Sequence, residues 1–139
     1  MREVSPSNSA ASGPQPGDWV VCHQRCSVPW LGEYFELAPE DGEAFQVIST
    51  GLPVPPGFGE ELNGLQLLGV LDPDGEEPHF GMPATRFAVC PEVEAEPGWQ
   101  IYRQRLDRHR LSRFYKLVNA GTAFESLPPL LRQWWMQRY

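Results

Sequence analysis

Lysine, long hydrophobic runs and cysteine are all scarce in this sequence, and each shortage excludes something. Lys116 is the only lysine, and the ten other basic residues are arginines, whose flat, forked guanidinium suits carboxylates and phosphates. No run of about 18 apolar residues occurs, so we expect no membrane-spanning helix. The first residues lack the apolar core of a secretory signal. Three cysteines without a framework spacing indicate reduced thiols in a cytoplasmic protein.

Motifs for catalysis are also missing. The sequence holds no glycine-rich phosphate loop, no nucleophile elbow and no metal-binding histidine pair. Cys22, Cys26 and Cys90 lack the spacing of a structural zinc site. We expect Cys22 and Cys90 on neighbouring strands, packed together as small apolar side chains, with a metal site or a disulfide as less favoured alternatives. His79 and His109 have no predicted partner. The sequence therefore predicts a protein that is not an enzyme and that needs no metal and no cofactor.

Charge is divided unevenly along the chain. Residues 99–139 hold eight of the 11 basic residues and two of the 18 acidic ones, which gives a charge near +6, whereas residues 1–98 are near −13. Opposite fields of this kind suggest either that the two parts dock on each other or that each meets a different partner. So acidic a stretch could also imitate a phosphate backbone, although solubility is the simpler interpretation of its charge.

The chain predicts short strands first and helices afterwards. Residues 1–16 are rich in Ser and Pro and poor in apolar mass, which predicts a disordered leader. In residues 17–93, short apolar runs alternate with Gly and Pro turns, which predicts an all-β unit. The expected strands are 18–22, 34–37, 44–49, 65–71, a return strand starting at His79, and 86–90, with a loop at 50–64, a turn at 72–75 and a short helical turn at 83–85. A small closed barrel fits this series, because closure removes exposed sheet edges.

Four pieces of this region resemble the small SH3-like barrels of short phage and bacterial proteins. They are GDWVVC at 17–22, GEAFQV at 42–47, DG at 74–75 and RFAV at 86–89, and they follow the order of that family over residues 16–91. The resemblance implies an SH3-like barrel, with Phe87 directed inward and Arg86 outward. It implies no active site, because most members of that family have no known role.

From Pro97 the hydrophobic period becomes helical. The pattern predicts a helix over residues 99–119, ended by Gly121. A second helix is expected to begin either at the capping-box sequence 122–125 or at Pro128 and Pro129, and to run to Tyr139. Residues 97–139 would then form an Arg- and Trp-rich helical hairpin. The predicted fold class is α+β, a five-stranded SH3-like barrel followed by a C-terminal helical hairpin.

The basic residues of the first predicted helix fall into two groups. Three border its apolar face, where they would pair with acids of the barrel or, alternatively, form an Arg-rich surface for nucleic acid or an acidic protein: Arg103, Arg110 and Arg113. Three others lie on the opposite face and are expected to be free for a partner: Arg105, Arg108 and Lys116.

Trp134 and Trp135 are the centre of a dense apolar patch near the end of the chain. Packing against the barrel or the first helix is the simpler interpretation, and an anchor for a partner is the alternative, since Trp and Arg recur at binding hot spots. Adjacent residues on a helix point about 100° apart. We therefore expect one of the two indoles to face away from what the other buries.

With no chemistry predicted, the function hypothesis is a non-catalytic binding protein. It would be a small regulator or inhibitor that docks on a larger protein assembly, and the resemblance above allows a phage-encoded protein that acts on a host factor. The six helix cations named above, with Trp134 and Trp135, are the candidate partner-binding residues. One alternative is nucleic-acid binding through helix 99–119, which the net charge of −7 opposes. The other is a structural subunit of an assembly. We expect no membrane partner, and the sequence leaves the oligomeric state open.

Overall fold

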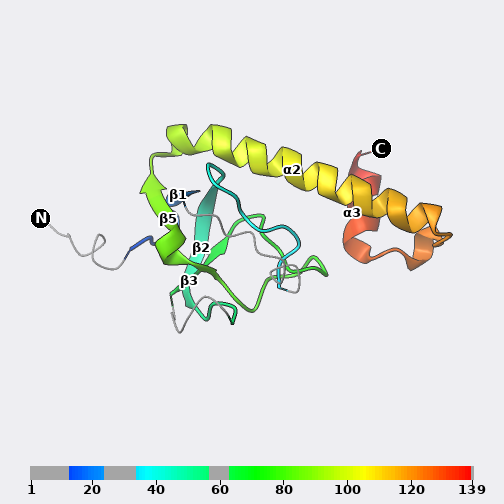
Figure 1. Cartoon of the computed structure of the whole chain (residues 1–139), viewed down its shortest axis with the longest axis horizontal. Helices are drawn as coiled ribbons and strands as arrows, with labels where there is room; N and C mark the ends of the chain where they lie inside the picture. The colour runs from blue at the N-terminus through cyan, green and yellow to red at the C-terminus, as the bar shows by residue number, and fades with distance from the viewer. Residues whose placement is uncertain (1–12, 24–33, 57–62, 139) are drawn as a thin grey trace, which may run out of the picture.

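The computed structural model describes residues 13–23, 34–56 and 63–138, and the structural statements below concern these residues. They form a five-stranded antiparallel sheet, a long helix over it and a second helix against the far half of the first (Figure 1). The strands are β1 Trp19–Cys22, β2 Ala44–Leu52, β3 Gly64–Leu67, β4 Met82–Pro83 and β5 Phe87–Cys90. The helices are α2 Glu92–Asn119 and α3 Pro129–Arg138, with the short 3-10 turns η2 Ala84–Arg86 and η3 Phe124–Ser126.

The sheet is open at both edges. Its strand order is β4-β3-β2-β1-β5, and no ladder joins the edge strands β4 and β5, both of which lie in the described part of the chain. The α+β class and the five strands are confirmed, whereas closure into a barrel is not. Strand β4 has only two residues, so it offers almost no free edge on which β5 could pair.

Strand β2 is longer than predicted. The alternation that predicts it is correct, because Phe45 and Val47 are both buried. The strand continues to Leu52, where it pairs with Gly64 of β3 after two shifts of register. The predicted loop at 50–64 is therefore shorter, because ladder hydrogen bonds hold residues at both of its ends.

Residues 34–37 do not form the predicted strand. They form a turn and bends, and the Phe35 side chain enters the core. The Glu36 amide donates to the Leu71 carbonyl at 2.8 Å, which ties this stretch to the chain that follows β3. We call residues 34–43 the acidic segment, because their side chains include three glutamates that contact α2.

The second half of the sheet follows the predicted turns more closely. The turn at 72–75 is present: the Gly75 amide donates to the Asp72 carbonyl at 2.9 Å, and Gly75 has a φ of 86°, which favours glycine. The return strand begins at Met82 instead of His79. The predicted helical turn is η2, and Phe87, which follows it, is buried as expected.

The core lies between the sheet and the first half of α2. It combines alternate residues of the strands with Tyr102 of α2, and its largest members are Tyr102, Phe35, Phe45, Leu65 and Met82. Trp99 of α2 packs on it, with its ring edge-to-face to Trp19 at 6.3 Å and to Phe45 at 6.2 Å between centroids.

Helix α2 begins earlier than predicted, at Glu92 instead of residue 99. Pro91 stands at the N-cap, and Glu92 and Glu94 lie in the first turn, where their charge is favourable. Pro97 is tolerated inside the helix, although it has no amide to donate to the preceding turn. Gly98 is buried so closely on the carbonyl oxygen of Gly42 that a Cβ there would collide with it.

Helix α2 is about 42 Å long, so its second half extends past the sheet, and α3 runs across it there (Figure 1). Gly121 ends α2 as predicted: its amide donates to the Val118 carbonyl, and the Thr122 amide donates to the Leu117 carbonyl, both at 3.0 Å, which is the Schellman arrangement. Of the two predicted starts for the second helix, the prolines are correct, because α3 opens at Pro129.

Candidate functional site

Ion pairs to the acidic segment hold α2 in place. Arg105 binds Glu43 with two nitrogens, Nε donating to Oε2 at 2.7 Å and Nη2 donating to Oε1 at 2.8 Å. The same Nη2 donates to the Ala38 carbonyl at 2.7 Å, and Nη1 lies 3.4 Å from Glu40. The Glu43 side chain is only 2% exposed. The hydrogen bond to Glu43 raises the pKa of Arg105, so this guanidinium is fixed as a cation inside the fold.

A second pair lies farther along α2. Arg110 donates to Glu36 through Nε at 2.7 Å and Nη2 at 2.8 Å, and Arg113 lies 4.0 Å from the same carboxylate, whose side chain is 1% exposed. One turn before Arg105 on α2, the Tyr102 hydroxyl donates to the Leu37 carbonyl at 2.8 Å. Burial first, and then the charge of Glu36, raise the pKa of Tyr102. The acidic segment is therefore bound to α2 at three successive points.

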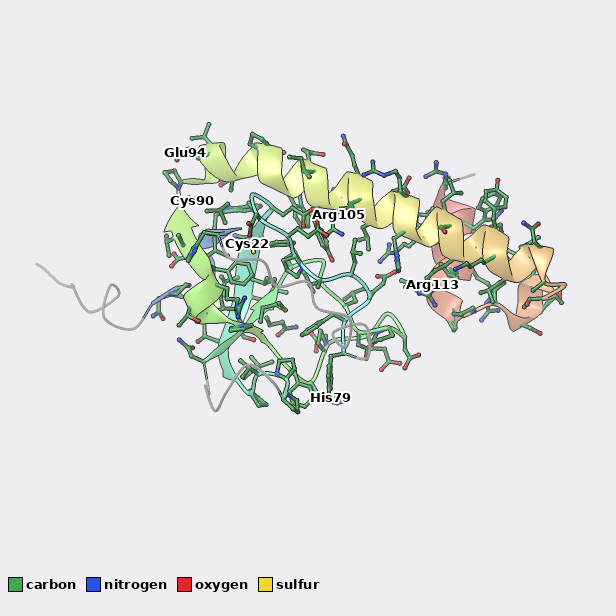
Figure 2. All side chains as sticks on the ribbon, in the orientation of Figure 1. Cys22, His79, Cys90, Glu94, Arg105 and Arg113 are labelled. Carbon is green, nitrogen blue, oxygen red and sulfur yellow. The ribbon has the colours of Figure 1, made fainter. Side chains whose placement is uncertain are left out.

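These pairs correct one prediction and confirm another. Arg105 was expected on the free face of the helix, but it lies only about 60° round the helix from the buried Tyr102, on the side that faces the acidic segment (Figure 2). The prediction misplaced the centre of the buried face toward Leu106 and Phe114. Arg110 and Arg113 bind acids of the first part of the chain, as the packing interpretation expected.

Three of the predicted cations bind none of the acids in the described residues, and all three are exposed: Arg103, Arg108 and Lys116. Arg103 keeps one contact, with its Cζ 5.7 Å from the centroid of the Trp99 ring. The basic half of the chain is thus partly neutralised within the fold, and three cations of α2 stay exposed without a described acidic partner.

A groove on the outer flank of α2 brings two of these cations together. It has a volume of about 580 Å³ and is lined by Arg103 and Arg108, by the side-chain amides of Gln100 and Gln104, and by Trp134 of α3, with Asp107, Leu106 and Arg110 completing the wall. Lys116 does not line it and borders a smaller hollow of about 200 Å³ with Arg113 and Leu117. The groove therefore divides the free cations into two inside it and one outside.

Both tryptophans pack within the fold. The Trp135 ring stacks on Phe114 with centroids 4.1 Å apart, and the Trp134 ring meets the same Phe114 at 6.3 Å. The expectation that one indole faces away is wrong, because α3 runs across α2 and both rings reach the same helix. Trp134 keeps an accessible part, since its side chain also lines the groove.

Asp107 is the acid in the groove wall, and two groups of α3 hold it. Trp134 Nε1 donates to Asp107 Oδ1 at 3.0 Å, and Arg138 donates to Oδ2. Burial acts to raise the pKa of Asp107, but the hydrogen bonds from Arg138 and Trp134 outweigh it and lower that pKa. The charge of Asp107 is thus matched by Arg138, which leaves Arg103 and Arg108 as the unbalanced charges of the groove.

The cysteines do not pack together as predicted. Strands β1 and β5 are neighbours, but the antiparallel register sets Cys22 opposite Phe87 and Cys90 opposite Trp19, at opposite ends of the ladder. Within the described residues, no disulfide joins them. Cys26 lies outside the described residues. Within the described ranges, no group of three or more His, Cys, Asp or Glu side chains is placed to hold a metal ion.

The two predicted lone histidines differ in their surroundings. His79 is exposed. His109 lies partly buried on α2, and burial lowers its pKa, although Glu36 acts in the opposite direction; Arg113, Arg110 and Arg105 add to the lowering. Sequence reasoning missed Glu36 and Glu43 as partners of α2, and their only signal was the general excess of acid before residue 98.

No protein-family model, no curated protein and no solved structure matches this chain. In the described part of the chain, no helix combines the length and the apolar character that crossing a bilayer requires. The SH3-like resemblance and the function hypothesis therefore stay predictions.

Proposed function

We propose that this protein is a non-catalytic binding protein, a small regulator or inhibitor that docks on a larger protein assembly through the outer side of α2. The observation that carries the proposal is the pairing of charge. Arg105 and Arg110 are bound to buried carboxylates, whereas Arg103 and Arg108 bind no described acid and line one groove with Trp134. Exposed Arg beside a half-buried Trp is the composition of a binding hot spot.

The internal ion pairs support this proposal because they make α2 a rigid platform. A helix held at Tyr102, Arg105 and Arg110 presents its outer residues in fixed positions, so little conformational entropy is lost when a partner binds. Two other proposals, the cytoplasmic setting and the SH3-like fold, have less support. Cys90 is a free thiol, which agrees with a cytoplasmic setting, and three of the SH3-like pieces fall on β1, β2 and β5.

Nucleic-acid binding has less support than protein binding. Three of the arginines that it requires, Arg105, Arg110 and Arg113, already lie at carboxylates of the acidic segment. Each phosphate contact of a nucleic acid needs an available cation, and the net charge of −7 opposes the approach of a polyanion.

The test is affinity capture from the native host, followed by binding of the purified captured protein. The wild-type chain is compared with Arg108→Glu in the groove and with Lys116→Glu outside it, since both changes alter the charge of the same helix equally. We expect a purified protein partner that loses about tenfold or more in affinity for Arg108→Glu, and we expect Lys116→Glu to bind like the wild type. Capture of nucleic acid alone, or a partner that neither α2 variant affects, would contradict the proposal.

A further inference from the structure

We infer that the groove on α2 binds an acidic peptide stretch of the partner in an extended conformation, with two of its carboxylates bound to Arg103 and Arg108. This inference rests on the proposed function and adds the chemistry that the groove selects.

The charge of the groove points to an anionic occupant. Two of its guanidinium groups have no acidic partner among the described residues, and its one carboxylate, Asp107, is matched by Arg138. A guanidinium binds a carboxylate through two parallel hydrogen bonds, which is how Arg105 binds Glu43 in this same chain. The arginines of the groove offer the same chemistry to a carboxylate from outside.

The position of the two arginines suits a segment that lies between them. Arg103 and Arg108 are five residues apart on α2, which is an axial separation of about 7.5 Å and a rotation of about 140° about the helix axis. Their side chains therefore leave the helix toward different flanks of the groove. A peptide that runs along the groove can offer a carboxylate to each arginine, since successive side chains of an extended chain point to opposite sides.

The remaining wall of the groove suits a main chain. Gln100 and Gln104 are four residues apart and lie on one side of α2, and each carries both a donor and an acceptor. They line the groove beside the arginines. Gln100 Nε2 already donates to Glu96 at 2.8 Å, but its second hydrogen, its carbonyl oxygen and the amide of Gln104 can bond the N–H and C=O groups of an extended segment. Trp134 adds an apolar surface on which a side chain between the two acids can rest.

A protein segment fits this groove better than a nucleic acid. A single strand is bound by a track of several cations with aromatic faces open for stacking. Here two cations are available, the Trp134 indole nitrogen is already bonded to Asp107, and the Asp107 carboxylate would lie beside the phosphates. A peptide with two carboxylates needs only two cations.

The inference is tested with fluorescently labelled peptides and the full-length chain, measured by fluorescence anisotropy at low and physiological salt. The first peptide carries four Asp residues that alternate with Ser, the second carries the same residues with the Asp in one block, and the third has Asn for every Asp. Oligothymidylate of similar length is the fourth probe. The protein variants are Arg103→Gln with Arg108→Gln, and Lys116→Gln as the matched control outside the groove.

We expect both Asp peptides to bind at least tenfold tighter than the Asn peptide. The double variant should lose at least tenfold in affinity for the Asp peptides, with urea denaturation showing that the variant is folded, and Lys116→Gln should bind like the wild type. Equal binding to all three peptides, an unchanged double variant, or tighter binding of oligothymidylate would each overturn the inference.

The inference and the proposed function can fail separately. The peptide titration needs no native partner. If the peptides do not bind but a captured partner loses affinity for Arg108→Glu, the proposed function stands and an acidic peptide is ruled out as the ligand. Conversely, peptide binding as expected in the absence of any captured protein would keep the chemistry of the groove and remove the docking role.

Discussion

Arg105 and Glu43 form a bidentate ion pair between α2 and the residue that precedes β2, with N–O distances of 2.7 and 2.8 Å. The Glu43 carboxylate is almost completely buried, and its Oε1 also accepts from the Glu40 amide at 2.8 Å. The pair therefore connects the helix, the acidic segment and the strand at one point. Arg105, which the sequence predicted to be free for a partner, is a structural residue.

Replacing Arg105 with Ala should destabilise the protein strongly. The change leaves the Glu43 carboxylate buried without its cation, and removing one partner of a buried pair costs about 3–5 kcal/mol. Chemical denaturation measures the loss. The control is Arg108→Ala on the same helix, which should change the free energy of unfolding by about 0.5 kcal/mol or less, as exposed substitutions usually do. A loss at Arg105 no larger than at Arg108 would show that the pair does not hold α2.

Gly98→Ala should destabilise the protein although alanine favours helix. The added Cβ would collide with the Gly42 carbonyl oxygen and lie 2.9 Å from the Ala44 amide nitrogen, so α2 must move off the sheet. Overpacking of this kind costs about 1–3 kcal/mol. Thermal or urea unfolding measures it, with Ser112→Ala at an exposed position of α2 as the control. A Gly98→Ala protein as stable as that control would refute the close packing of α2 on β2.

Acid should weaken the fold through His109. Its pKa is lowered from its ordinary 6.5, mainly by burial, so the unfolded chain binds this proton more readily than the folded one. The sign follows from linkage: the stability contributed by neutral His109 is present above about pH 6.5 and is lost as the pH falls below it. Urea denaturation at pH 7.5 and 5.5 should show a smaller loss for His109→Gln than for the wild type.

The matched control for that measurement is His79→Gln, at an exposed position. It should lose as much stability between the two pH values as the wild type does. If the two glutamine variants behave alike, the pH dependence does not come from His109.

The two described thiols should differ in reactivity. Cys22 is 1% exposed, whereas Cys90 is partly exposed and its pKa is raised by burial and by Glu94. Alkylation of the native protein with peptide mapping should therefore modify Cys90 slowly at neutral pH and faster at alkaline pH, because the thiolate is the nucleophile. Cys22 should react only after denaturation. A Cys22–Cys90 disulfide in the map would contradict the register of β1 and β5.

Local patterns predicted the elements that depend on neighbours in the sequence. The alternation around Phe45, the Asp-Pro-Asp-Gly turn and the Gly121 helix stop all appear in the structure. The predicted start of α2 was too late because a proline at 97 is typical of a first turn. Burial of Ala95 and Gly98 against the sheet stabilises a helix that already starts at Glu92. Residues 34–37 have the composition of a strand, yet their contacts to α2 hold them as irregular chain.

The sequence by itself determined the α+β class, the unequal distribution of charge and the Arg- and Trp-rich helices, since composition and period need no knowledge of distant contacts. Only the tertiary structure decided which cations are free. Arg105 and Arg108 are three residues apart and chemically identical, but Arg105 meets a buried carboxylate 62 positions away in the chain, whereas Arg108 lines an open groove. The reason is physical: a charge is neutralised by what lies within a few ångströms of it, and folding alone brings those residues together.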